Sequence, residues 1–249
     1  MTEFQIVRVP ILPFRIVNAH LIVGSKGCIL VDAGLPGTEI RVERVLKKLG
    51  KSFSDIKLIM ITHAHVDHAG NAAVLRKLSG APIVAHIGDL KYYKRESPMT
   101  FCPTGWAGRL FLNAPLIYQS YQAFEPDILL KDGDILDLGE FGIPAIVRHT
   151  PGHTAGSISL EMNTKDALVG DLIASGVFIG GVVRTCHAIR PPFEDDPHAV
   201  SMELQRLLDA GFERFYMGHG GPLDACEVQR HAQALATIKN IKDLCIGNH

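Results

Sequence analysis

The 249-residue sequence predicts an α/β (α+β) fold in which two β-sheets pack together and helices cover the outside. Each half of the chain begins with short runs rich in β-branched residues, bounded by Pro and Gly, and ends in helical patterns. A hydrophobic share of 47% and a charged share of 20% are ordinary for a globular protein with a substantial core. Two such halves are expected to pack sheet against sheet, with the helices outside.

In the first half, apolar patterns and punctuation by Pro and Gly place the elements. Strands are expected at 4–11, 18–25, 27–34, 56–62 and 81–86, and helices at 37–50 and 69–80. Thr38 is expected to cap the first helix and Gly50 to end it, and Gly80 ends the second.

In the second half, strand patterns resume within 126–142 and at 144–150, 156–162, 166–171 and 213–221. Helices are expected at 197–211 and 225–244. Between the halves, residues 91–124 hold eight of the seventeen aromatic residues. The chain shows no short-period repeat and no flexible linker. We therefore expect a single domain, 1–249, with an aromatic-rich insertion at about 91–124.

Composition restricts the partners. The formal net charge is -1 and no basic tract is present, so nucleic-acid binding is not expected. No apolar run has the length of a membrane span or a signal-peptide core. The five cysteines are scattered and lack a C-x-x-C pair, which suits free thiols in a reducing compartment. These features indicate a cytoplasmic protein without a membrane partner.

The segment "THAHVDHAG" concentrates four metal-ligand side chains in six positions: His63, His65, Asp67 and His68. Packing four hydrophilic groups together without a counter-cation would be costly. Four ligands are too many for one divalent metal that must also keep an open site, and they are well suited to be shared between two metals. The cluster therefore predicts a metal site that needs further ligands from elsewhere.

Three more candidates lie at strand-to-loop junctions, where binding groups often concentrate. His153 lies in "HTPGHTAGS", Asp171 in "ALVGDLI" and His219 in "YMGHGGP". A lone histidine is more often a hydrogen-bonded or surface residue than a ligand. That interpretation is kept for the seven others, which are His20, His86, His149, His187, His198, His231 and His249.

The motifs "THAHVDH", "HTPGHT", "LVGD" and "MGHGGP", with the earlier "LVDAGLPG", resemble the metallo-β-lactamase superfamily over essentially the full length. The resemblance implies a four-layer αββα sandwich of two mixed β-sheets. It also implies two divalent metal ions per chain, expected to be zinc, with manganese or iron as alternatives. The implied ligands are His63, His65 and His153 for one ion, Asp67, His68 and His219 for the other, and Asp171 as a bridge.

Two divalent ions balanced by two carboxylates would retain positive charge and stabilise hydroxide near neutral pH. We therefore expect a metal-bridging hydroxide to attack the carbonyl of a small ester, thioester or lactone. Asp67 is the expected catalytic residue, which orients the water and accepts its proton. The expected partner is a small-molecule substrate, and a homodimer is left open.

Departures from known branches narrow the interpretation. The family's true β-lactamases generally carry Cys or Ser at the position of Asp171, whereas glyoxalase II, lactonase and phosphodiesterase branches retain the aspartate. The "GHGGP" ending differs from the "GHEY"-like ending of glyoxalase II, and Ala174 replaces the tyrosine of the best-known lactonases. The alternatives are a mononuclear iron enzyme like persulfide dioxygenases, or a hydrolase with β-lactamase or phosphodiesterase activity.

Substrate contacts are expected from the aromatic insertion. Trp106, Phe101, Tyr92 and Phe111 are candidates for an apolar pocket beside the metals, although each could instead be core or a subunit interface. Segment 173–196 is a second expected pocket wall, and His187 within it is a further candidate contact.

Overall fold

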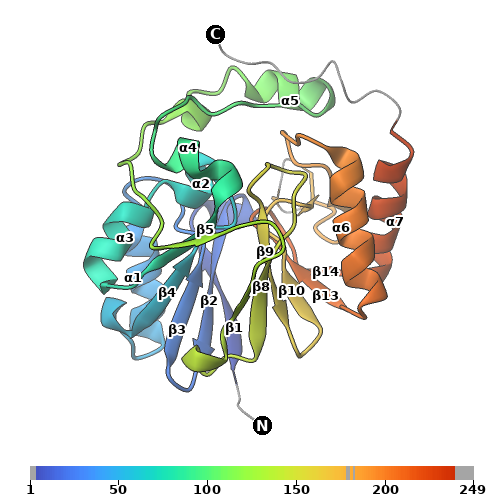
Figure 1. Cartoon of the computed structure of the whole chain (residues 1–249). Coiled ribbons are helices and arrows are strands. Elements are labelled where there is room, and N and C mark those ends of the chain that lie inside the picture. The colour runs from blue at the N-terminus through green and yellow to red at the C-terminus, as the bar shows by residue number, and fades with distance from the viewer. Residues whose placement is uncertain (1–3, 178–179, 182, 239–249) are drawn as a thin grey trace.

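Two six-stranded sheets lie face to face in the computed structural model, which describes residues 4–177, 180–181 and 183–238 (Figure 1). The first sheet follows the chain in the order β1 (Gln5–Pro10), β2 (Asn18–Gly24), β3 (Gly27–Val31), β4 (Ile56–Met60), β5 (Ile83–His86) and β6 (Ile128–Leu130). Its first three strands are antiparallel and the pairs from β3 to β6 are parallel.

The second sheet is also mixed. Its order is β14 (Leu223–Asp224), β13 (Arg214–Tyr216), β10 (Asp166–Leu168), β9 (Ile158–Met162), β8 (Ala145–His149) and β7 (Ile135–Asp137). All neighbours are antiparallel except β10 and β13. A separate two-stranded ribbon joins β11 (Ala174–Ser175) to β12 (Ala188–Ile189).

Alternation along the strands produces the layers. In β3, Ile29 and Val31 point between the sheets, where they pack with Val147 of β8 and Leu160 of β9. The intervening Leu30 points the other way, into the layer beneath the helices of the first half. Because successive side chains of a strand face opposite sides, one apolar strand serves both layers.

Helices close the outer faces. The first sheet is covered by α1 (Glu39–Lys48), α2 (Val66–Ala69), α3 (Ala72–Ser79) and α4 (Leu90–Tyr93), and the second by α6 (Pro197–Asp209) and α7 (Ala225–Ala236) (Figure 1). Leu46 of α1 and Leu75 of α3 are fully buried in the first outer layer, as are Leu204 of α6 and Val228 of α7 in the second. The predicted αββα sandwich of mixed sheets is confirmed.

The aromatic insertion contains α4, α5 (Gly105–Phe111) and the 3-10 turn Pro115–Tyr118, and α5 lies above the sandwich in the view of Figure 1. The other 3-10 turns are Pro13–Arg15, Phe53–Asp55, Ile87–Asp89 and Gly139–Phe141. Among the described residues, no helix is long and apolar enough to cross a membrane.

Several local expectations need correction. The helix expected at 69–80 starts later, at Ala72, because Gly70 and Asn71 separate it from the short α2, and it ends before Gly80 as expected. Thr38 occupies the N-cap position of α1, but its hydroxyl donates to the Leu35 carbonyl instead of capping the helix. The last residues of the helix expected at 225–244 lie partly outside the described residues.

The cysteines also depart from expectation. Cys28, Cys186 and Cys226 are free thiols. Cys102 is disulfide-bonded, so the expectation of free thiols is wrong at that position.

Candidate metal centre

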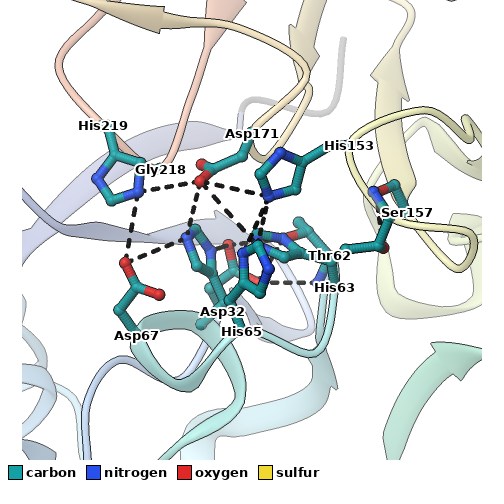
Figure 2. Close-up of polar contacts among 12 residues, drawn as sticks. Asp32, Thr62, His63, His65, Asp67, His153, Ser157, Asp171, Gly218 and His219 are labelled. Atoms are coloured by element: carbon teal, nitrogen blue, oxygen red, sulfur yellow. Dashed lines mark hydrogen bonds and ion pairs between the residues drawn. The ribbon is translucent and has the colours of Figure 1, made fainter. Parts of the chain in front are cut away.

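The predicted ligands come from segments that follow strands of both sheets, and Figure 2 shows their side chains facing one another. His63 and His65 follow β4, and His68 lies in α2. The remaining three come from the second sheet and follow β8, β10 and β13. They are His153, Asp171 and His219. Asp67 of α2 is the seventh member. The fold therefore brings together side chains that are up to 156 positions apart in the sequence.

Three histidines form the first group. His63 Nε2 and His65 Nδ1 lie 3.1 Å apart, and His153 Nε2 lies 3.1 Å and 3.0 Å from these two atoms. All three side chains are buried. Their nitrogen atoms thus form a nearly equilateral triangle.

Asp171 connects this triangle to a second group. Its Oδ2 atom lies 4.0 Å from His63 Nε2 and 3.8 Å from His153 Nε2 on one side. On the other side it lies 3.5 Å from His68 Nε2 and 2.9 Å from His219 Nε2. One carboxylate oxygen therefore faces nitrogen atoms of both groups.

Asp67 completes the second group. Its Oδ2 atom lies 3.8 Å from His68 Nε2 and 3.4 Å from His219 Nε2. The Asp67 side chain is 22% exposed, whereas the two histidines and Asp171 are buried. Asp67 is therefore the member of this group most open to a bound molecule.

Hydrogen bonds behind the rings fix the histidine tautomers. His68 Nδ1 lies 2.8 Å from Asp32 Oδ2, and His219 Nδ1 faces the carbonyl oxygen of Ile16. Because both partners only accept, each Nδ1 carries a proton, and in the neutral ring Nε2 presents a lone pair to the centre. Metal-binding histidines in proteins usually show this arrangement. His68 Nε2 is buried and has no hydrogen-bond partner.

Asp32 and Thr62 together hold the rings of His63 and His68 in place. The Asp32 carboxylate accepts from the Thr62 amide at 2.8 Å and from the Thr62 hydroxyl at 2.9 Å, and Thr62 Oγ1 lies 3.1 Å from His63 Nδ1. Asp32 has a left-handed backbone, with φ of 65°. Such strain persists where surrounding contacts hold it in place, and here those contacts orient two ligand rings.

Electrostatics favour positive charge in the centre. Burial lowers the pKa of His63 well below its usual value, so that ring is neutral. Burial also lowers the pKa of His219, but the charge and hydrogen bond of Asp171 outweigh it and raise that pKa to about 9. The charge of the buried Asp171 carboxylate thus favours a positive charge beside it, as a proton or a metal ion would supply.

The donor set fits divalent metal. At a zinc–nitrogen distance of about 2.0–2.1 Å, two ligands at a tetrahedral angle lie about 3.3–3.4 Å apart. The nitrogen separations of 3.0–3.1 Å in the three-histidine group are within a few tenths of an ångström of this value. Imidazole and carboxylate together suit zinc, iron and manganese.

Gly218 makes room for the second group. A Cβ atom at this position would lie 2.3 Å from His68 Cε1 and 2.5 Å from Asp171 Oδ1. These separations are far below van der Waals contact, so any side chain here would displace the two ligands.

Asp89 joins the loops that carry the three-histidine group. Its carboxylate accepts from the Ala64 amide at 2.9 Å, from the Thr154 hydroxyl at 2.8 Å and from the Gly156 amide at 2.9 Å. Ala64 lies between two predicted ligands, and Thr154 follows the third. Burial raises the pKa of the Asp89 carboxyl, and the three donors oppose that rise.

A third group, of His86, His149 and Asp132, also has its possible ligand atoms within 4.8 Å of one another, but its rings are arranged differently. The rings of His86 and His149 are stacked 3.7 Å apart at 10°, so their nitrogen lone pairs lie in two nearly parallel planes. By contrast, the ring centroids of the three-histidine group are 4.4–4.8 Å apart and the ring planes are nearly perpendicular. The carboxylate nearest the stacked rings belongs to Asp132, whose side chain is 86% exposed.

A cavity of about 100 Å³ opens beside the centre. Phe101 and Phe111 line it, as proposed from the sequence. Trp106 does not: its side chain is 80% exposed and borders a different hollow. Tyr92 is buried and borders another neighbouring hollow.

His187 also lies outside this cavity. Its Nδ1 atom pairs with Glu227 Oε1 at 2.9 Å, which gives it a partner on α7. Segment 173–196 does contribute to the cavity, through Pro192 and Phe193.

Comparison with known proteins adds an independent line. The family model of the metallo-beta-lactamase superfamily matches residues 12–219, which include all seven converging side chains. This chain belongs to the metallo-beta-lactamase superfamily. Superfamily membership and the histidine–aspartate clusters together support a metal-binding hydrolase.

Individual similar proteins include two named hydrolases and a solved structure. Hydroxyacylglutathione hydrolase GloC of Haemophilus influenzae is 30% identical over 163 residues, 65% of this chain and 66% of that protein. Acyl-coenzyme A thioesterase MBLAC2 of Homo sapiens is 29% identical over 184 residues, 65% of this chain and 60% of that protein. The chain thus spans less than two thirds of their length. A metallo-beta-lactamase family protein from Thermus thermophilus superposes with a TM-score of 0.66 at 25% identity, covering 94% of this chain and 78% of that one.

Sequence reasoning missed several contributors to the site, among them Asp32, Asp89 and Phe193. Asp32 was visible only within the "LVDAGLPG" motif, and Asp89 and Phe193 carried no local signal of their own. Asp32 could have been suspected, since it directly follows a strand, and strand-to-loop junctions often carry binding groups. The role of Asp89 depends on two loops that are remote in sequence.

Proposed function

We propose that this chain is a hydrolase with two divalent metal ions, expected to be zinc, that cleaves a small ester, thioester or lactone. The position of Asp171 carries the proposal. Its Oδ2 atom lies within 4.0 Å of a nitrogen atom from four histidines, two in each group. A carboxylate that faces two ligand groups at once is the arrangement needed to bridge two ions.

The proposed ligand assignment follows the two groups. His63, His65 and His153 would hold one ion, and Asp67, His68 and His219 the other, with Asp171 shared. A pair of divalent ions supplies Lewis acidity, which lowers the pKa of water and polarises a carbonyl oxygen.

Asp67 is the proposed proton acceptor. Asp67 and Asp171 are the carboxylates that line the cavity, and Asp171 is buried among four histidine nitrogens. Asp67 is more exposed and lies at the cavity wall. It can therefore accept a hydrogen bond from the attacking water, orient it toward the substrate carbonyl and accept its proton.

An acyl substrate is supported by the relatives. One is named a hydroxyacylglutathione hydrolase and another an acyl-coenzyme A thioesterase, and both names denote thioester hydrolysis. We therefore rank thioesters first, followed by esters and lactones.

Metal removal and a substrate panel test the proposal. Chelator-treated protein should lose hydrolysis, and zinc or manganese should restore it. The panel contains thioesters, esters, lactones, phosphodiesters and β-lactams. Activity that survives in verified metal-free protein contradicts the proposal.

Matched variants separate ligand loss from general damage. His153→Ala should lose about one equivalent of metal and most activity. His198→Ala removes an exposed histidine that lies outside the centre, and should retain both metal and activity. Full metal content in His153→Ala contradicts the ligand assignment. One equivalent of iron in the unmodified protein would instead favour the dioxygenase alternative.

A further inference from the structure

The cavity beside the metal centre has walls from three separate parts of the chain. Leu12, Ile16 and Val17 come from the segment between β1 and β2. The aromatic insertion contributes four residues, which are Phe101, Phe111, Leu116 and Ile117. Val66 of α2 and the pair Pro192 and Phe193 complete the apolar surface.

The polar groups of this cavity are all accounted for by the centre. Its polar lining residues are His65, Asp67, His153, Asp171 and His219, and each is a proposed metal ligand. Among the described lining residues there is no Lys, Arg, Ser, Thr, Asn or Gln. The cavity therefore offers a substrate one polar end, where the ions would lie, and otherwise hydrocarbon.

We propose that this cavity is an acyl-chain subsite that selects uncharged, apolar acyl groups longer than acetyl. This inference rests on the proposed function, because it places the reacting carbonyl at the metal end. A charged or hydroxylated chain would lose its hydration without gaining a partner from these walls. An apolar chain gains free energy with each methylene group that leaves water.

Aromatic contacts align the subsite with the centre. The Phe101 ring stacks on His65 at 5.3 Å between centroids and 26° between planes. Phe193 lies 4.6 Å from Phe101 and meets His65 edge-on at 6.1 Å. Both phenylalanines are nearly buried, at 4% and 6% exposure. The apolar wall thus reaches a proposed ligand without a gap, so the first carbons of the chain would lie beside the metal end.

Leu116 lies at the mouth of the subsite. It lines the cavity and is 45% exposed. A charged side chain at this position would therefore remain solvated and be tolerated by the fold.

The test is a chain-length series with the metal-loaded protein. The probes are p-nitrophenyl esters from acetate to decanoate, and the p-nitrophenyl half-ester of suberic acid, which carries a terminal carboxylate. Because each buried methylene contributes a roughly constant free energy, kcat/KM should rise about fourfold per methylene until the cavity is filled. The suberate half-ester should be hydrolysed at least tenfold more slowly than octanoate. A flat series, or equal rates for these two esters, overturns the subsite.

Variants make the test specific. Phe111→Ala should reduce the gain in kcat/KM per methylene, because it removes part of the apolar wall. Leu116→Arg should raise kcat/KM for the suberate half-ester relative to that for the octanoate ester, because the arginine supplies a cation at the mouth of the subsite. Trp106→Ala, whose side chain is exposed and outside the cavity, is the matched control and should keep the unmodified chain-length profile. If the Phe111→Ala and Leu116→Arg profiles match the control, the assignment is wrong.

A binding measurement separates this inference from the proposed function. Calorimetric titration with acetate, octanoate and suberate needs no turnover. If no ester is hydrolysed, the proposed function fails, yet tighter binding of octanoate than of acetate or suberate still supports the subsite. Equal binding of the three carboxylates overturns the subsite even in an active hydrolase.

Discussion

Replacing Asp89 tests whether the three-histidine group depends on one buried carboxylate that joins its two loops. In Asp89→Asn, the side-chain oxygen can keep the bonds to the Ala64 amide and the Thr154 hydroxyl, which share Oδ2. The new amide group then faces the Gly156 N–H, donor against donor. Both the Gly156 N–H and the new amide then lack an acceptor; since one such buried donor costs about 1–3 kcal/mol, we expect Asp89→Asn to lose at least that much unfolding free energy.

Asp89→Ala removes all three acceptor bonds. The Thr154 hydroxyl has an alternative partner, Ser157 Oγ at 3.0 Å, so two amides are left unpaired. The expected loss is about 2–6 kcal/mol, a large part of the 5–15 kcal/mol typical of a folded domain. The Asn variant is therefore the more informative of the two.

Two assays read the effect of Asp89→Asn. Urea unfolding of metal-free protein measures stability, and competition with a chromophoric chelator measures metal affinity. Because the bonds lost at Asp89 position both loops of the three-histidine group, we expect affinity to fall about tenfold. Asp132→Asn, at an 86% exposed carboxylate, should change stability by less than about 0.5 kcal/mol. An Asp89→Asn protein with the stability and metal affinity of the unmodified chain would refute the reasoning.

Further expectations concern pH, close packing and catalysis. Burial raises the pKa of the Glu194 carboxyl to about 7 despite its pairing with Arg190. The protonated carboxyl therefore contributes fully to folding stability below the pKa of the unfolded chain, near 4.5. This contribution is lost as the pH rises through about 7. Relative to Glu194→Gln, the unmodified protein should lose up to about 3 kcal/mol across this window in urea titrations, and parallel pH profiles would contradict this. Gly218→Ala would place a methyl group against His68, so metal analysis should find about one ion fewer per chain; retention of the full content would show that the loop can move aside. Asp67→Asn should lower kcat by about 10²- to 10⁴-fold in metal-loaded protein, and an unchanged kcat at equal metal content would exclude the proton-accepting role.

Much of the sandwich was accessible from the sequence because its strands are short apolar runs with clear ends. The run 56–62 predicts β4, and the same run delivers His63 and His65 to the sheet edge. The break between α2 and α3 was not accessible. A Cβ atom at Gly70 would lie 2.6 Å from Pro36 Cδ, a close approach set by tertiary packing.

The candidate site divides in the same way. Dense local motifs identified the side chains that converge, because four potential metal ligands in six positions have few structural explanations. Residues whose role depends on a distant partner were missed, as Asp89 illustrates. For Trp106, residue type and neighbourhood gave no information about which way the ring points, and this residue is 80% exposed. Whether the converging side chains bind two ions remains a prediction.

Diffraction from zinc-loaded crystals, with anomalous differences collected at the zinc edge, tests the central claim most directly. We expect two peaks per chain. One should lie among His63, His65 and His153, the other beside His68 and His219, and both should be next to Asp171. A single peak, or peaks away from these side chains, would contradict the proposal that this centre holds two metal ions.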